Sequence, residues 1–286
     1  AKLVIAGSMF APIAFSQQEQ YSVHPDSKKQ AGVPRGKVTQ AKFADSTVYP
    51  GTDRDYWIYV PAQYEPGQTA SLMVFQDGKA YVNGSTFNAL DNLIHRRDIP
   101  VMIGVFVNPG VVPPQNENAQ ARFNRSLEYD DISDRYSQFL IDELLPHIER
   151  THDVQFSIDP NLRGITGASS GAICAFNVAW HRPDSFHRIY STIGTYVGLR
   201  GGDEIPTLIR KTEPKPLRVF LQDGENDLNI YGGDWWIANQ MMQRALKFSG
   251  YELKHEWGDG GHSRKHGNAI FPDAMRWLWR SDAAEV

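Results

Sequence analysis

Seven short runs rich in apolar residues place the strongest constraint on how this chain can fold. The runs are DYWIYV (55–60), SLMVFQ (71–76), VMIGVFV (101–107), LRGITG (162–167), HRIYSTI (187–193), LRVFLQ (217–222) and ELKHEW (252–257). Several of them are continuously apolar and bounded by turn residues, which is typical of strands covered on both faces. We therefore predict an α/β fold in which helices cover both faces of a mainly parallel central sheet.

Helical patterns occupy several of the intervals between these runs. In residues 133–149 apolar side chains recur every four residues, with Ser133 placed to cap the helix and Pro146 placed to kink or end it. The other predicted helices are residues 170–181, 234–249 and 267–280. Residues 108–131 break the alternation, because they are polar and rich in helix-breaking residues. A loop of this length either borders a binding cleft or is a surface excursion.

Length and composition narrow the class of protein further. The 286 residues suit one large domain, which we place at residues 17–286. The net charge is −4 and no block of Lys and Arg stands out, so we expect no nucleic-acid partner. The single cysteine, Cys174, excludes an intrachain disulfide and a multi-cysteine zinc site, and we interpret it as a buried structural thiol.

The first residues resemble the remnant of a secretory signal peptide. Residues 1–16 contain Lys2, an apolar stretch and then small residues, and they are too short to span a membrane as a helix. An N-terminal strand or a plain tail is the alternative. We expect a secreted or periplasmic protein without a membrane span.

A serine in a frame of glycines is the first candidate for chemistry. Residues 167–171 read Gly-Ala-Ser-Ser-Gly, and they fit the pattern G-x-S-x-G only with Ser169 at the centre. In that pattern a sharp strand-to-helix turn lifts the serine hydroxyl above the sheet, and small neighbours let strand and helix approach closely. A strand-like run precedes the motif and a helix-like run follows it. The sequence therefore predicts Ser169 as a nucleophile.

A serine nucleophile needs a histidine base that is held by an acid, and both should follow late strands. His262 lies in the glycine-rich loop after the last predicted strand, whereas His255 falls within that strand and His266 opens the final helix. For the acid we favour Asp227, while Asp223 and Glu225 in the same loop stay open as alternatives.

Metal and phosphate sites fit the sequence less well. The acidic and amide residues at alternate positions from 223 to 229 are similar to a calcium loop, but Leu228 stands where that loop requires glycine. His262 and His266 lack the glutamate of the H-E-x-x-H pattern, and neither a P-loop nor a convincing dinucleotide motif occurs. We expect no metal.

The tetrahedral intermediate of acyl transfer needs backbone donors. We predict the N–H of Ser170 as one donor and that of Gly78 or Lys79 as the other. Four aromatic residues near these loops are candidates for binding an aromatic acyl group or a sugar: Tyr81, Tyr231, Trp235 and Trp236. Lys79, Arg125 and Arg264 are interpreted as surface charges, with contact to an anionic substrate as the alternative.

Five segments in this order resemble a known esterase family: SLMVFQDG, ELLPHIER, RGITGASSGAICAF, LRVFLQDGENDLN and WGDGGHS. The family includes enterochelin esterases, D-type esterases, and feruloyl and acetyl-xylan esterases, and the resemblance covers residues 35–280. It implies an α/β-hydrolase fold, no cofactor, and ester hydrolysis through an acyl-enzyme. It also implies Ser169 as nucleophile, His262 as base and Asp227 as acid.

From these observations we expect a secreted serine carboxylesterase. Its expected substrate is a feruloyl or acetyl ester of plant polysaccharide, and a siderophore ester is the alternative. A non-catalytic binding module and an acyltransferase on the same scaffold are the two other hypotheses.

Overall fold

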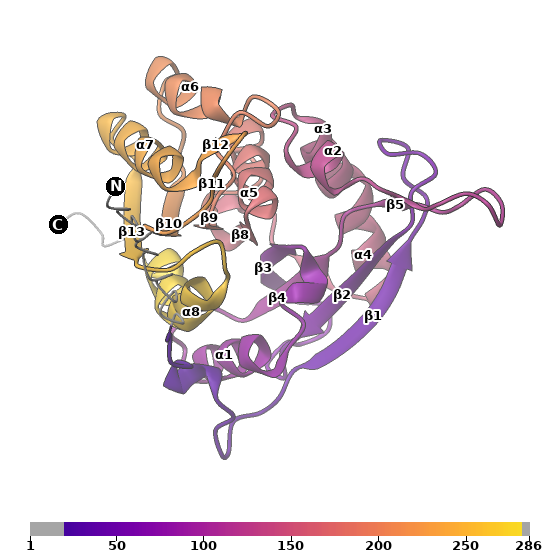
Figure 1. Cartoon of the computed structure of the whole chain (residues 1–286). Helices are drawn as coiled ribbons and strands as arrows, with labels where there is room; N and C mark the ends of the chain where they lie inside the picture. The colour runs from indigo at the N-terminus through magenta and orange to yellow at the C-terminus, as the bar shows by residue number, and fades with distance from the viewer. Residues whose placement is uncertain (1–19, 282–286) are drawn as a thin grey trace, which may run out of the picture.

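The computed structural model describes residues 20–281, so the predicted signal-peptide remnant at 1–16 lies outside the described part. A central sheet runs through the molecule in the order β1-β2-β4-β3-β8-β9-β10-β13 (Figure 1). Its strands are β1 (Lys37–Phe43), β2 (Arg54–Val60), β3 (Thr69–Gln76), β4 (Met102–Val107), β8 (Arg163–Ala168), β9 (Arg188–Thr192), β10 (Arg218–Gly224) and β13 (Glu252–Gly258). The short β7 (Gln155–Phe156) also pairs with β3.

All seven predicted strands are present, and the central ones are parallel. β1 pairs antiparallel with β2, and β2 pairs antiparallel with β4. The apolar pattern does not predict β1, because this edge strand is mostly solvent-exposed and reads KVTQAKF, which lacks a continuous apolar run. Pairing with β2, rather than a buried face, accounts for its strand conformation.

Helices cover both faces of the sheet, as predicted. α1 (Gly84–His95) and α8 (Lys265–Trp279) pack on one face, and α4 (Leu145–His152), α5 (Ser170–His181) and α7 (Trp235–Phe248) pack on the other (Figure 1). α6 (Ile205–Lys211) joins the second group. The sequence analysis did not predict α1 or α6.

The helix predicted at 133–149 is divided into three parts. α3 (Arg135–Gln138) passes into a π-helical stretch at Phe139–Leu144, and α4 continues from there. Pro146 has no N–H to donate, and its ring displaces the carbonyl four residues earlier. The predicted kink therefore takes the form of a wider helical turn just before the proline.

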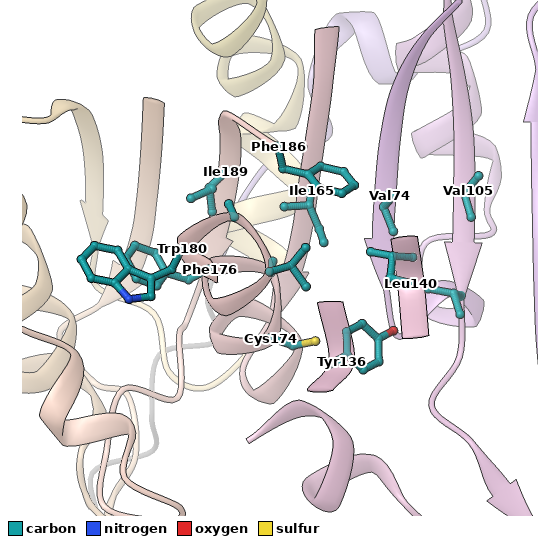
Figure 2. Packing of buried hydrophobic residues seen from close by; sticks show 14 of the residues in the cluster. Val74, Val105, Tyr136, Leu140, Ile165, Cys174, Phe176, Trp180, Phe186 and Ile189 are labelled. Atoms are coloured by element: carbon teal, nitrogen blue, oxygen red, sulfur yellow. The ribbon is translucent and has the colours of Figure 1, made fainter. Parts of the chain in front are cut away.

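The larger of two apolar cores lies between the sheet and α5. Cys174, Phe176 and Trp180 of α5 pack in the same cluster as Ile165 of β8 and Ile189 of β9 (Figure 2). Cys174 is buried in this cluster, and burial raises the pKa of its thiol well above the usual value. Its interpretation as a structural residue is consistent with both observations. Within residues 20–281, no helix has both the length and the apolar character needed to cross a bilayer.

A buried ion pair anchors the long segment 108–131, which contains β5 (Val111–Val112), β6 (Arg122–Phe123) and α2 (Arg125–Tyr129). Arg54 of β2 donates to both carboxylate oxygens of Glu128, at 2.8 and 3.2 Å, and both side chains are fully buried. Glu128 also accepts the Gly110 N–H at 3.1 Å. The base of the segment is thus tied to the sheet, and α2 is held above the carboxyl ends of the central strands.

We expect Glu128→Leu to destabilise the protein by about 3–5 kcal/mol, because it leaves the Arg54 charge buried without a partner. The double variant Arg54→Met/Glu128→Leu should recover much of this loss. Urea unfolding measures both changes. Asp53→Asn is the matched control, because the ion pair of Asp53 with Lys42 is largely exposed. We expect this substitution to lower the free energy of unfolding by less than about 1 kcal/mol. Equal losses for Glu128→Leu and Asp53→Asn would contradict the anchoring role.

Candidate active site

Ser169 occupies a strained turn between β8 and α5. Its φ and ψ angles are 59° and −124°, a conformation that costs a non-glycine residue about 1–3 kcal/mol. A Cβ added to Gly167 would lie 2.3 Å from the carbonyl carbon of Gly171, so only glycine lets strand and helix approach this closely. The turn predicted from G-x-S-x-G is therefore present, and it lifts Ser169 above the sheet.

Three residues from distant parts of the chain form a hydrogen-bonded row. His262 Nε2 lies 2.8 Å from Ser169 Oγ, and His262 Nδ1 lies 2.6 Å from Asp227 Oδ1. The Asp227 side chain is fully buried, whereas 21% of the His262 side chain is exposed. The structure therefore brings together the nucleophile, base and acid that the sequence predicted.

Backbone contacts lock the loop that carries Asp227 to the loop that carries His262. The N–H groups of Glu225 and Asn226 donate to the carbonyl oxygens of Gly258 and Gly260, at 2.9 and 3.1 Å. A Cβ on Gly224 would lie 2.1 Å from the Gly260 oxygen, so a larger residue there would push the loops apart. These backbone contacts hold the loops of Asp227 and His262 at a fixed distance from each other.

Neither alternative acid occupies the position of Asp227. Glu225 is exposed on the outer side of the loop. Asp223 is fully buried, but it contacts the Asp227 carboxyl rather than His262. Burial acts to raise the pKa of Asp227, but hydrogen bonds from His262, Asp223 and the Leu228 N–H outweigh it and hold the pKa below its usual value. Asp227 is therefore a carboxylate at neutral pH.

Ser169 Oγ has a second hydrogen-bond partner besides His262. Thr195 Oγ1 lies 3.1 Å from Ser169 Oγ and accepts the Trp235 indole N–H at 3.2 Å. Because the indole can only donate, the Thr195 hydroxyl proton is available to Ser169, and the Ser169 proton can then point to His262 Nε2. The Asp227 carboxylate accepts the Nδ1–H of His262, so each group in the row from Trp235 to Asp227 donates to the next one. Nothing in the sequence marked Thr195 as part of this row.

The row opens into a cavity of about 530 Å³. Tyr81, Arg125 and Arg264 line it together with Ser169 and His262. Arg125 is not a free surface charge, because it donates to both oxygens of Asp77, at 2.8 and 2.7 Å. The α2 helix that the buried pair anchors thus supplies one wall of the cavity, and segment 108–131 does border a cleft.

Arg264 lines this cavity, and among residues 20–281 it forms no ion pair with a carboxylate. Its guanidinium lies 5.4 Å from the centre of the Tyr81 ring, and its Nη1 is buried with no acceptor among residues 20–281. Burial raises the pKa of Tyr81 to about 12, so its hydroxyl stays protonated at neutral pH. The cavity wall formed by these two residues is aromatic and cationic.

The predicted oxyanion donors lie at the starts of helical turns. Ser170 is the first residue of α5, where a backbone N–H has no acceptor within the helix. Gly78 begins the 3₁₀ turn Gly78–Ala80 and packs against β4, since a Cβ there would lie 2.3 Å from the Phe106 carbonyl carbon. The Lys79 N–H donates to Asn108 Oδ1 at 3.0 Å and would have to leave this acceptor to serve an oxyanion.

The four aromatic candidates have different surroundings. Tyr81 lines the cavity, whereas Tyr231 is 94% exposed at the turn between β11 (Asn229–Ile230) and β12 (Gly233–Asp234). Trp235 is buried edge-on against His262, with ring centres 5.8 Å apart. Trp236 packs edge-on against Trp257 of β13 at 5.3 Å. Of the four, Tyr81 is thus the one that faces this cavity, and Trp235 supports the hydrogen-bonded row from behind.

Comparisons with known proteins show which family the chain belongs to. The model of a family described as "Putative esterase" matches residues 47–278. An Iron(III) enterobactin esterase from Dickeya dadantii is 28% identical over 156 residues, which make up 49% of this chain and 34% of that enzyme. The aligned region therefore corresponds to about a third of the length of that relative.

Two solved structures are similar in fold. The enterobactin esterase of Shigella flexneri, solved in the presence of enterobactin, superposes with a TM-score of 0.72 at 19% identity, over 91% of this chain and 63% of that one. A ferulic acid esterase from Anaeromyces mucronatus, in complex with ferulic acid, superposes with a TM-score of 0.67 at 18% identity, over 91% and 97%. These similarities confirm the predicted α/β-hydrolase fold.

The Thr195 contact can be tested through the reactivity of Ser169 toward a fluorophosphonate probe. We expect Thr195→Val to lower the second-order labelling rate roughly fivefold, the equivalent of one hydrogen bond of about 1 kcal/mol. Thr195→Ser keeps the hydroxyl and should label at nearly the wild-type rate. Mass spectrometry of the labelled peptide measures the rate at Ser169. If the valine and serine variants labelled equally fast, the hydroxyl would have no part in orienting Ser169.

Proposed function

Because the chain belongs to this family of esterases, we propose that it hydrolyses carboxylic esters through an acyl-enzyme formed on Ser169. The observation that carries the proposal is the row of Ser169, His262 and Asp227, with contacts of 2.8 and 2.6 Å. A serine hydroxyl at its ordinary acidity is a weak nucleophile, and an adjacent imidazole held by a carboxylate is the arrangement that activates it.

In the proposed mechanism, Ser169 Oγ attacks the ester carbonyl carbon while His262 Nε2 takes the serine proton. Asp227 holds the His262 tautomer that carries hydrogen on Nδ1 and stabilises the imidazolium. The tetrahedral intermediate collapses when its bond to the alcohol oxygen breaks, and His262 returns the proton to that oxygen. Water then attacks the acyl-enzyme with the same base and releases the acid and free Ser169.

Backbone donors stabilise the negative oxygen of the intermediate in this proposal. The Ser170 N–H is one donor, at the positive end of α5, and the N–H of Gly78 or Lys79 is the other. Side chains and backbone groups supply every proton transfer and charge contact in these steps. We therefore propose a reaction that needs no cofactor.

For the substrate, we propose a feruloyl or acetyl ester of plant polysaccharide as the first candidate. Tyr81 in the cavity wall supports an aromatic group, and a structural neighbour is described as a ferulic acid esterase. A polymer of this kind lies outside the cell, so this candidate also requires the export proposed from residues 1–16. A siderophore ester is the second candidate, favoured by the positive charge of Arg264 and by the enterobactin esterase relative.

The first experiment is turnover of a small panel by the wild type and by Ser169→Ala. The panel contains 4-nitrophenyl acetate, methyl ferulate, acetylated xylan and a catecholate siderophore. We expect Ser169→Ala to lose activity by roughly a thousandfold or more while its circular dichroism spectrum is unchanged. Ser126→Ala, on the exposed side of α2, is the control.

Each outcome of this panel has a distinct meaning. An active Ser169→Ala enzyme would contradict the mechanism, and a folded wild type that turns over no ester would favour a binding module. Ferulate or xylan release supports the plant-polymer candidate, whereas siderophore cleavage supports the second. Transfer of the acyl group to an added alcohol in preference to water would identify an acyltransferase.

Arg264 gives a separate prediction about substrate charge. We expect Arg264→Gln to lower kcat/KM for mono-4-nitrophenyl succinate at least roughly tenfold, since a hydrogen bond to a charged group is lost. Activity on the neutral 4-nitrophenyl acetate should stay within about twofold. Initial rates with both esters provide the measurement, and the exposed Arg200→Gln is the control. An equal loss on both esters would show that Arg264 supports the site instead of selecting an anion.

A further inference from the structure

Two buried carboxyl groups lie in contact behind His262. Asp223 is the second-last residue of β10, and its Oδ1 accepts the Gly224 N–H at 2.8 Å. Asp227 Oδ1 is occupied by His262 Nδ1 at 2.6 Å and by the Leu228 N–H at 2.5 Å. The second oxygen of each carboxyl is buried and has no other donor among residues 20–281. The two carboxyl groups lie close enough that each influences the ionisation of the other.

A single proton shared by the two carboxyl groups stabilises this arrangement. Two ionised carboxylates in contact repel each other strongly inside a protein, so such a pair holds one proton between them. A protonated carboxyl also supplies the donor that a buried carboxylate oxygen otherwise lacks. A single proton on one of the two acids therefore removes the repulsion and also satisfies an acceptor of the other.

The surroundings decide which acid carries the proton. His262 and the Leu228 N–H already stabilise Asp227 as a carboxylate. Burial, and then the hydrogen bond and charge of Asp227, raise the pKa of Asp223 to about 9. The proton therefore belongs to Asp223 at neutral pH.

Among residues 20–281, the other groups that influence the ionisation of Asp223 are neutral. Asn239 of α7 contributes a neutral amide, and Trp257 of β13 is the residue paired in register with Asp223. On the opposite side, β9 ends at Thr192, beside the preceding residue of β10. Within the described chain, Asp227 is the titratable group that faces Asp223, and His262 lies beyond it.

We propose that Asp223 is a positioning residue whose protonated carboxyl donates a hydrogen bond to Asp227 Oδ2 and fixes that carboxylate against His262. The inference rests on the proposed triad, because it concerns how the acid of that triad is held. Asp227 Oδ1 serves His262 while Oδ2 receives the Asp223 proton. The carboxylate is then held at both oxygens and cannot rotate away from the imidazole.

The first test measures stability and needs no esterase activity. Unfolded Asp223 loses its proton near the ordinary pKa of aspartate, about 3.9, whereas the folded protein keeps it up to about 9. Between these pH values the folded state binds one more proton than the unfolded state. The contribution of this group to the free energy of unfolding of the wild type therefore falls as pH rises. We expect the Tm of Asp223→Asn, relative to wild type, to rise between about pH 5 and about pH 8. A constant or falling difference would overturn the protonated state.

The second test measures turnover of 4-nitrophenyl acetate. Asp223→Asn keeps a donor of the same shape, so kcat at neutral pH should stay within about threefold of wild type. Asp223→Leu leaves Asp227 Oδ2 without a donor, and we expect kcat to fall between roughly fivefold and a hundredfold with little change in KM. Glu225→Gln, exposed in the same loop, is the control.

The pH profile separates positioning from mere packing. In wild type, ionisation of Asp223 near pH 9 places a second charge beside Asp227 and removes the donor, so kcat should decline there. Asp223→Asn cannot ionise and should lack this decline. Equal kcat losses in the asparagine and leucine variants, or an unchanged alkaline decline in Asp223→Asn, would overturn the positioning role. If the wild type hydrolyses no ester, the proposed function fails, and the stability test still decides the state of Asp223.

Discussion

The contact between the loops after β10 and β13 is the constraint on which the rest of the site depends. Two backbone hydrogen bonds join these loops, and Gly224 passes so close to Gly260 that a side chain has no room. Asp227 and His262 belong to these two loops, 35 residues apart in the chain. The sheet brings the loops together because β10 and β13 are adjacent and parallel, so both loops leave from the same edge.

Ser169 reaches this edge by a different route. It stands at a strained turn after β8, two strands away from β10, and its backbone is held by hydrogen bonds to Thr192 and Thr195. The buried pair of Arg54 and Glu128 stabilises the far wall of the cleft, since it anchors the helix that carries Arg125. The strained backbone at Ser169 is thus held in place by hydrogen bonds to neighbouring elements.

The hydrogen bonds of the site all run in one direction, from donor to acceptor along the row. The Trp235 indole, which can only donate, lies at one end of the row, and the Asp227 carboxylate, which can only accept, lies at the other. In our proposal Asp223 adds a second donor to that carboxylate from behind. A buried polar group that lacks a hydrogen-bond partner lowers the stability of the folded protein. A row in which every member has a partner is therefore rigid, because any movement would break one of its hydrogen bonds.

Most of the fold and the three residues of the row can be predicted from the amino-acid sequence. Apolar runs predicted seven strands, because a buried parallel strand is apolar along its whole length. The edge strand β1 is polar and was not predicted by this pattern. The helices α1 and α6 were not predicted either. The glycine frame marked Ser169, and chain order together with glycine-rich loops marked His262 and Asp227.

The partners that surround this row depend on how distant parts of the chain pack together. Thr195, the pairing of Arg125 with Asp77, and the contact between Asp223 and Asp227 join residues whose local sequence carries no sign of their partners. The same holds for the aromatic candidates, of which Tyr81 lines the cleft while Trp236 packs against β13. Local patterns report how a segment folds, but a side chain's partners depend on which strands become neighbours, and that is settled by packing of the whole sheet.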